Sequence, residues 1–228
     1  MNRLAAVLAL LLFAGAAPST AIVVGSKKFT ESYVLGEIAR AALQRAGFPV
    51  ELSQGMGGTI ILWQALTSSQ ISVYPEYTGT IAEEILKAKE PPGPDEVRAS
   101  LRQQGIGMTR ELGFNNTYAL VMRRDRASEL GIRKISDLRA HPELRLGLTH
   151  EFLDRQDGWS PLSARYGLQE RDVRGIDHAI GYAALVTGSI DVKDAYSTDA
   201  RIAETNLVVL EDDLHFFPQY KAVFLYRL

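Results

Sequence analysis

The chain has 228 residues, of which 46% are hydrophobic and 23% charged, a composition suited to one large globular domain or two small lobes. Its formal net charge is −2 with no long block of one sign, so neither a nucleic acid nor an anionic membrane surface is an expected partner. The absence of cysteine excludes thiol catalysis, disulfides, thiolate metal sites and lipidation at cysteine. The four histidines lack the spacing of metal ligands, and we expect no metal and no cofactor.

The N-terminus has the organisation of a secretory signal peptide over residues 1–21. A basic residue precedes an apolar run over residues 4–14, and the small residues Ser19 and Ala21 suit cleavage by signal peptidase. A transmembrane anchor would need about 20 apolar residues, more than this run contains. We therefore expect the mature chain to begin near Ile22 and to be periplasmic, or otherwise free outside the cytoplasm.

The start of the mature chain alternates strands and helices. β-branched and apolar runs predict the strands, and apolar residues at helical spacing predict the helices. The expected elements are strands over residues 22–24, 50–52 and 71–73 and helices over residues 30–46 and 60–66, with Thr59 as the N-cap of the second helix. Such alternation implies a parallel α/β sheet, whose ligand cleft lies outside the carboxyl ends of the strands. The segment VYPEYTGT (residues 73–80) ends the third strand, so Tyr74 and Tyr77 should lie at the mouth of this cleft and not in the core.

The rest of the chain predicts a second lobe. A proline-rich surface loop over residues 91–94 precedes a charged helix. The later elements are expected to be helices over residues 95–104, 135–138 and 159–166, the second capped by Ser136, and strands over residues 118–122 and 144–148. Two chain crossings, near Gly113 and near Phe217, would form a hinge. We expect lobe 1 over residues 22–112, lobe 2 over residues 113–214, and a crossing back to lobe 1 over residues 215–228.

A short internal repeat supports two lobes. The segments ALTSSQISVYPEYT (residues 65–78) and ALVTGSIDVKDAYS (residues 184–197) share Ala, Leu, Ile, Val and Tyr at equal offsets. Each segment reads as a helix end, a turn, a strand and then a tyrosine, Tyr77 or Tyr196. Two such units would present one strand-end tyrosine each to a shared cleft. Chance similarity between two ordinary strand–helix units is the alternative.

Six blocks, in order, resemble the substrate-binding proteins of ABC transporters for glycine betaine, choline and carnitine. The blocks are GSKKFTES (25–32), GGTIILWQAL (57–66), YPEYTGT (74–80), NNTYAL (115–120), DAYSTDARI (194–202) and LEDD with FPQY (210–220). The resemblance covers nearly all of the mature chain. It implies a two-lobed α/β flytrap, the type II periplasmic-binding-protein fold, acting as a monomer that hands a quaternary amine to an ABC permease in the inner membrane, and not an enzyme.

The resemblance also implies an aromatic cage. By motif, the cage residues of the family correspond to Tyr77, Tyr118, Tyr196 and Tyr220. A trimethylammonium group has no hydrogen to donate, and the faces of aromatic rings are the best match for its diffuse charge. For each tyrosine taken alone, the alternative is a half-buried packing residue.

The carboxylate of a betaine would need a separate anion pocket. Lys27 and Arg155 match family positions that bind this carboxylate, and Thr80 matches a position that donates a hydroxyl. A cation, a bidentate guanidinium and a helix end together suit an anion. The alternatives are that Lys28 is the buried lysine, or that Arg155 pairs with Asp154 or Asp157.

The chain departs from the family pattern at several positions. Asn116 stands where some relatives carry an aspartate, which removes a negative charge beside the cage and bears on preference among cationic ligands. Ser72 replaces a usual aspartate, and Ala200 replaces a usual glycine. The sequence ends at Leu228, whereas family members continue, so we expect lobe 1 to be incomplete at its C-terminus.

Two rival functions remain. An enzyme is disfavoured because the chain has no P-loop, no G-x-S-x-G elbow and no histidine placed beside an acid and a serine. A binding protein for ergothioneine, itself a betaine, or for an amino acid without N-methyl groups is the second alternative. The sequence does not rank these ligands against choline, glycine betaine, carnitine and proline betaine.

Overall fold

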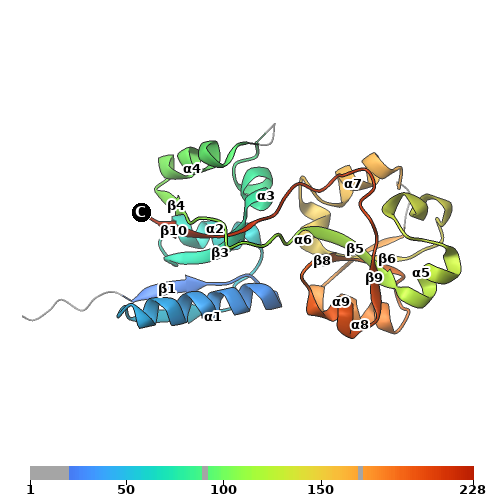
Figure 1. The fold of residues 1–228 in the computed structure, drawn as a ribbon, viewed down its shortest axis with the longest axis horizontal. Helices are drawn as coiled ribbons and strands as arrows, with labels where there is room; N and C mark the ends of the chain where they lie inside the picture. Colours follow the sequence, from blue (N-terminus) through green and yellow to red (C-terminus); the bar gives the residue numbers. More distant parts are fainter. Residues whose placement is uncertain (1–20, 89–91, 169–171) are drawn as a thin grey trace, which may run out of the picture.

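The computed structural model describes residues 21–228 except 89–91 and 169–171, so all but the last residue of the predicted signal peptide lies outside the described residues. The chain forms two α/β lobes, which lie side by side along the longest axis of the molecule (Figure 1). In the described ranges no helix has both the length and the apolar character needed to cross a membrane.

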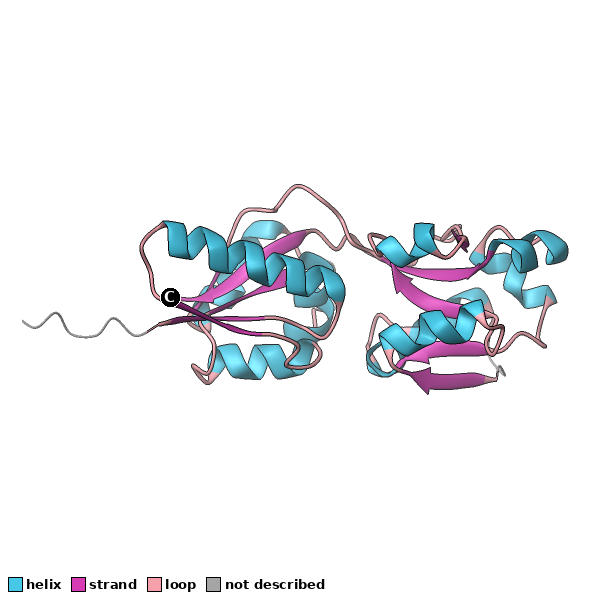
Figure 2. Cartoon of the chain, turned by 90° about the horizontal axis from the view of Figure 1, so that it is seen from below, coloured by secondary structure: helices cyan, strands magenta, loops and turns pink. Residues whose placement is uncertain are grey.

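Lobe 1 contains a five-stranded sheet with the strand order β2-β1-β3-β10-β4. Its strands are β1 (Ile22–Gly25), β2 (Val50–Ser53), β3 (Val73–Tyr77), β4 (Ile106–Met108) and β10 (Ala222–Arg227). Its helices are α1 (Thr30–Arg45), α2 (Thr59–Thr67), α3 (Thr78–Thr80), the π-helix η1 (Ile81–Ile85) and α4 (Pro94–Gln103). Figure 2 shows helices on both faces of this sheet, which explains the apolar strands.

Lobe 2 contains a second five-stranded sheet, with the order β7-β6-β8-β5-β9. Its strands are β5 (Tyr118–Arg123), β6 (Leu146–Thr149), β7 (Val173–Ile176), β8 (Val192–Tyr196) and β9 (Leu207–Val209). Its helices are α5 (Arg124–Leu130), the 3-10 helix η2 (Ile135–Ala140), α6 (His150–Asp154), α7 (Trp159–Tyr166), α8 (His178–Val186) and α9 (Ala200–Glu204).

The two sheets have equivalent topologies. In lobe 1, β1 is parallel to β2 and β3, and β10 is antiparallel to β3. In lobe 2, β6 is parallel to β7 and β8, and β5 is antiparallel to β8. The strands that end the two repeat segments, β3 and β8, therefore take the same place, which supports the repeat over chance similarity. The prediction of a parallel sheet is wrong, because each sheet also contains an antiparallel strand. This is the strand that follows a crossing, β10 in lobe 1 and β5 in lobe 2.

Two chain segments connect the lobes, one between β4 and β5 and the other between β9 and β10 (Figure 1). The segments meet at an antiparallel bridge between Asn115 and Lys221. The backbone N–H of Asn116 donates to the Tyr220 carbonyl at 3.0 Å, and the Tyr220 N–H donates to Asn115 Oδ1 at 2.7 Å. The predicted two-lobed fold with a hinge of two crossings is confirmed.

Several local predictions are wrong. Gly58, not Thr59, is the N-cap of α2, and Lys134, not Ser136, is the N-cap of η2. The third strand begins at Val73 and contains the tyrosines. Tyr74 is fully buried in the core of lobe 1, because residues 74 and 77 differ in parity and point to opposite faces of the strand. Of these two tyrosines, only Tyr77 contacts the aromatic residues between the lobes.

Candidate functional site

Five aromatic rings meet between the lobes. The predicted tyrosines converge, and Phe29 joins them; we call Phe29, Tyr77, Tyr118, Tyr196 and Tyr220 the aromatic cluster. The ring centroids are 4.8 Å apart for Phe29 and Tyr196, 5.2 Å for Tyr118 and Tyr196, and 5.7 Å for Tyr118 and Tyr220. A narrow cavity is lined by the cluster and by Lys27, Thr80, Asn116 and Glu151. The structure therefore brings together seven of the eight predicted site residues around one cavity, and Arg155 contacts its wall.

Strand ends position the tyrosines. Tyr77 is the last residue of β3, and Tyr196 is the last residue of β8. Tyr118 is the first residue of β5 and pairs in register with Tyr196. An antiparallel pair places the start of one strand beside the end of the other, so these two rings are neighbours. Tyr220 lies on the second crossing, two residues before the start of β10.

A glycine makes room for one of these rings. Gly79 lies in α3, two residues after Tyr77, and a Cβ at this position would lie 2.6 Å from Cδ1 of Tyr220. Real Cβ atoms do not approach a ring carbon so closely. The glycine of the YTGT segment is therefore required by the close approach of Tyr220, far away in the sequence.

Buried hydroxyls of the cluster donate to carboxylates. Tyr77 Oη donates to Glu31 Oε1 at 2.5 Å, and Tyr220 Oη donates to Asp157 Oδ2 at 2.5 Å. Burial, reinforced by these carboxylates, raises the pKa of both tyrosines far above the usual range, so both remain neutral donors. Burial likewise raises the pKa of Tyr118 and Tyr196. The cluster is therefore a wall of neutral rings.

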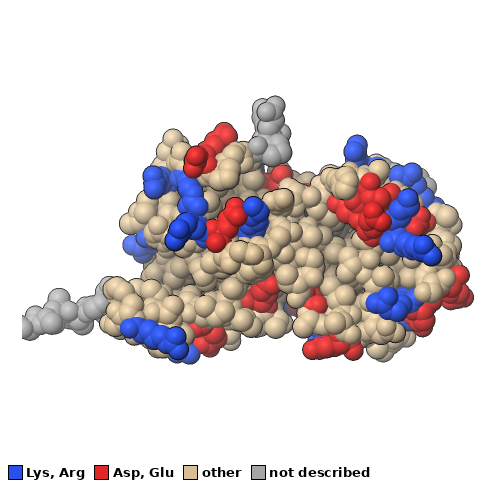
Figure 3. All heavy atoms as spheres, in the orientation of Figure 1, with Lys and Arg blue, Asp and Glu red and all other residues tan. Residues whose placement is uncertain are grey.

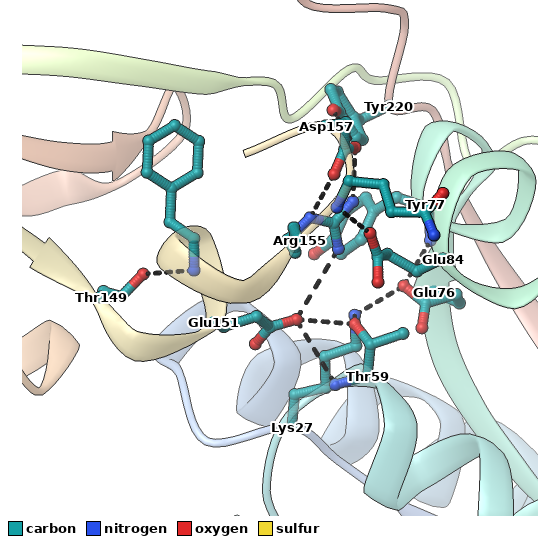
Figure 4. Close-up of polar contacts among 12 residues, drawn as sticks. Lys27, Thr59, Glu76, Tyr77, Glu84, Thr149, Glu151, Arg155, Asp157 and Tyr220 are labelled. Atoms are coloured by element: carbon teal, nitrogen blue, oxygen red, sulfur yellow. Dashed lines mark hydrogen bonds and ion pairs between the residues drawn. The ribbon is translucent and has the colours of Figure 1, made fainter. Parts of the chain in front are cut away.

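Lys27 lies beside the cluster, buried, with its charge already paired. Its Nζ donates to Glu76 Oε1 at 2.6 Å and to Thr59 Oγ1 at 2.8 Å (Figure 4). Burial raises the pKa of Glu76, and Lys27 opposes this rise. The neighbouring Lys28 is exposed and pairs with Asp177 at 2.9 Å, so the alternative that Lys28 is the buried lysine is wrong.

Arg155 is also buried and paired. Its Nε and Nη2 bind the two carboxylate oxygens of Asp157, each at 2.6 Å, one of the pairings left open by the sequence. The remaining nitrogen, Nη1, lies 3.8 Å from Glu151 Oε1 (Figure 4). The guanidinium carbon is 5.2 Å from the centroid of the Tyr118 ring.

Glu151 connects the two lobes. It lies in α6 of lobe 2 and accepts a hydrogen bond of 2.7 Å from Thr59 Oγ1, at the start of α2 in lobe 1. Burial alone would raise the pKa of Glu151, but Lys27, the Thr59 hydroxyl and Arg155 together lower it below the ordinary value. An ionised carboxylate therefore lies at the edge of the cavity between the two buried cations.

Further polar contacts hold the lobes together. Glu31 of α1 accepts hydrogen bonds from Thr198 of lobe 2 at 2.5 Å and from Asn116 Nδ2 at 2.8 Å. Glu84 of lobe 1 accepts from the Gln156 N–H of lobe 2 at 2.8 Å. These contacts define a closed arrangement of the lobes.

Sequence reasoning missed Phe29 and the acidic residues Glu31 and Glu151. Phe29 is the N-cap of α1, and its place in the loop after β1 was the available signal, because that loop ends at the cleft. Glu31 and Glu151 gave no such signal. In the parts of the chain that the structure describes, no group of three or more His, Asp or Glu residues could hold a metal ion.

The charged side chains on the face seen in Figure 3 are interspersed, with blue and red groups in contact over both lobes. Lys and Arg gather into no single patch there. This face offers no extended field of one sign.

Comparisons with known proteins identify the family. The model of the substrate-binding domain of ABC-type glycine betaine transport systems matches residues 20–228. The chain is 34% identical over 245 residues to a glycine-betaine-binding protein of Pseudomonas aeruginosa, covering 97% of this chain and 78% of that one. It is 33% identical over 214 residues to an ergothioneine transport permease/ergothioneine binding protein of Helicobacter pylori, covering 90% of this chain and 38% of the relative.

A solved structure agrees with this match. The crystal structure of a glycine betaine/carnitine/choline ABC transporter is similar with a TM-score of 0.67 and 28% identity, over 90% of this chain and 79% of that chain. The resemblance inferred from the six sequence blocks is thereby confirmed, as is the type II periplasmic-binding-protein fold. The family consists of extracytoplasmic solute-binding components, so the enzyme alternative is excluded. The chain belongs to the substrate-binding proteins of ABC-type glycine betaine transport systems.

Proposed function

We propose that the protein captures a quaternary ammonium compound in the aromatic cluster and delivers it, as a periplasmic monomer, to an ABC permease. The observation that carries this proposal is the convergence of neutral aromatic rings from both lobes and from the second crossing on one cavity. The ligand that best matches a cavity lined by such rings is a cation that cannot donate hydrogen bonds. The N-terminal signal peptide predicted from the sequence agrees with the extracytoplasmic family.

The carboxylates around the cluster support a cationic ligand. Glu31 accepts from Tyr77, and Glu151 lines the same cavity. Negative charge near the rings adds to the attraction that the ring faces exert on a cation. Glycine betaine, choline and carnitine all carry the trimethylammonium group that this arrangement suits.

The carboxylate of a betaine would bind to the cationic side chains beside the same cavity. A lysine ammonium has three donors, and among the described residues Lys27 Nζ has two acceptors, which leaves one donor for a ligand. Arg155 Nη1 faces Glu151 at only 3.8 Å and could likewise turn to a ligand. Thr80, buried in α3, would add its hydroxyl, and Asn116 would contact the ligand beside the cage. We propose these four residues as the polar part of the site.

The distribution of the strands supports the limits that we propose for the lobes, residues 22–112 and 113–214, with residues 215–228 crossing back to lobe 1. Strands β1 to β4 and β10 share one sheet, and β5 to β9 share the other. Closure of the two lobes around the ligand would then present one defined shape to the permease.

Ergothioneine is the alternative ligand. The observation in its favour is the 33% identity to the Helicobacter pylori relative. A second cavity adjoins the aromatic cluster and shares Lys27, Phe29, Glu151 and Tyr196 with it, so a betaine with a large substituent has space beside the cage.

A thermal-shift panel tests the proposal, with titration calorimetry on each hit. The panel contains choline, glycine betaine, carnitine, proline betaine and ergothioneine, with tert-butyl compounds as uncharged controls. We expect stabilisation by at least one quaternary amine, and its size follows the ratio of ligand concentration to Kd. The absence of any shift across the panel would overturn the proposed ligand class.

A further inference from the structure

Tyr196 forms part of the wall between two cavities. It lines the cavity of the aromatic cluster and also the second cavity, where His178 lies. The imidazole of His178 stacks on the Tyr196 ring with a centroid distance of 4.8 Å and an interplanar angle of 24°. Such an offset stack fixes the orientation of the ring that it supports. Of the two cavities, His178 lines only the second.

His178 is held by groups on both ring nitrogens. Its Nε2 lies 3.0 Å from Asp199 Oδ2, and its Nδ1 lies 3.5 Å from Lys193 Nζ. Asp199 also accepts from the Tyr196 N–H at 3.1 Å and from Tyr182 Oη at 2.6 Å. Nε2 can donate to the carboxylate while Nδ1 accepts from the lysine, an arrangement that a neutral imidazole satisfies on both sides.

The lysine behind this histidine occupies a shaped site. Lys193 lies in β8 and is fully buried, and its Nζ donates to the Asp194 carbonyl at 2.5 Å. A Cβ at position 181 would lie 2.8 Å from Cε of Lys193, so Gly181 of α8 makes room for its stem. Burial lowers the pKa of Lys193. The absence of a side chain at position 181 therefore leaves the space that Lys193 occupies in this network.

A charge on His178 would act directly on the Tyr196 ring of the aromatic cluster. A protonated imidazole would place a positive charge against the Tyr196 ring, which then attracts a second cation less strongly. Other groups also face His178 or its cavity. They are Lys193, Asp199 and Tyr182 in lobe 2, and Lys27, Lys28, His150, Glu151 and Asp177 around the second cavity. None of these stacks on Tyr196.

We propose that His178 is a positioning residue of the cage whose protonation weakens the binding of quaternary ammonium ligands, so that affinity falls as the pH falls. This inference rests on the proposed function. It assigns to the Asp199, His178 and Lys193 network a role in the affinity of the site, beyond support of the fold. Neutral His178 supports the ring, and charged His178 competes electrostatically with the ligand.

The experiment is a calorimetric titration of the full chain with choline between pH 5 and pH 8, where imidazole is the side chain that ordinarily changes charge. Choline keeps its single positive charge throughout, so any pH dependence belongs to the protein. We expect wild-type affinity to fall on the order of three- to tenfold toward pH 5. His178→Phe keeps an aromatic stack without a titrating group, and its profile should be flat.

Two further variants make the result specific. His150→Gln removes the other imidazole of the second cavity and should keep the wild-type profile. His178→Gln removes both the stack and the charge, and it should bind choline more weakly than His178→Phe at pH 8 while also showing a flat profile. A wild-type profile in His178→Phe would overturn the inference and leave the proposed function intact. Failure of every quaternary amine to bind wild-type protein at any pH would overturn both.

Discussion

Arg155 and Asp157 form a two-point ion pair, in which Nε and Nη2 of the guanidinium each lie 2.6 Å from a carboxylate oxygen. Tyr220 donates to the same carboxylate. The pair therefore fixes a tyrosine of the aromatic cluster through its hydroxyl. It leaves Nη1 of Arg155, which lies 3.8 Å from Glu151 Oε1, as the nitrogen that we propose for a ligand.

Arg155→Ala should reduce affinity for glycine betaine on the order of tenfold or more, and for choline much less, because only glycine betaine presents a carboxylate to a guanidinium. The substitution also leaves the carboxylate of Asp157 buried without its cation. The matched control is therefore Arg155→Ala combined with Asp157→Asn, which removes the uncompensated charge but should retain the discrimination. Equal losses for the two ligands, measured by calorimetry, would assign Arg155 to support of Tyr220 alone.

Lys27→Met should destabilise the protein by about 3–5 kcal/mol, because it leaves the carboxylate of Glu76 buried without its cation. Burial already raises the pKa of Glu76, and loss of Lys27 raises it further. A raised folded-state pKa gives stability that is present at low pH and lost as the pH rises through it. The deficit, measured by urea unfolding, should therefore be larger at pH 8 than at pH 5.

Lys28→Met is the neighbouring control for this prediction. Lys28 is exposed, and its partner Asp177 is on the surface, so unfolding should change little at either pH. Similar deficits in both variants would show that the Lys27 and Glu76 pair does not carry the stability assigned to it.

The charge of the ligand should matter as much as its shape. Replacing the trimethylammonium group of choline by a tert-butyl group should weaken binding by about 1–3 kcal/mol, because cation–π attraction is lost while the shape is kept. Competition calorimetry measures this difference. Equal affinities for the two compounds would contradict a cation-binding role of the aromatic cluster.

Tyr77 and Tyr196 should be coupled in binding. They come from opposite lobes, so a ligand contacts both rings only when the lobes close. Tyr77→Ala and Tyr196→Ala should each lower affinity, and the double variant should lose less than the sum, since one deletion already reduces the gain from closure. X-ray scattering should show ligand-induced compaction in the wild type and not in the double variant. Additive losses with normal compaction would make the tyrosines packing residues.

The sequence predicted those features that depend on local patterns. The helix over residues 159–166 and the strand at Ile22 follow from apolar spacing and β-branched residues, and both are observed. The equal offsets of the repeat predicted that the strands β3 and β8 take equivalent places in the two lobes, and each is the central strand of its sheet. The crossing back to lobe 1 was predicted over residues 215–228, but the antiparallel pairing of β10 with β3 was not, because pairing between residues so far apart leaves no local signal.

The candidate site also contains residues that the sequence motifs indicated and contacts that they did not. The tyrosines were found because the motifs around them are specific, whereas the partners of Lys27 and Arg155 depend on side-chain geometry. Glu76 lies beside Lys27 only because β3 and the loop after β1 meet at the same edge of the sheet. The burial of Lys193 was not predicted from the sequence, because charged residues are almost never placed in a core.

The contact between Gly79 and Tyr220 also limits how this binding site could diverge. Because the ring of Tyr220 and the backbone carbonyl of Gln219 both occupy the space of a side chain at position 79, this position is expected to remain glycine while the second crossing keeps its path, although part of lobe 1 and all of lobe 2 separate the two residues in the chain. A designer who seeks a larger cavity would therefore shorten residue 220 and leave position 79 unchanged. New ligand preferences would then be reached through the side chain at position 220.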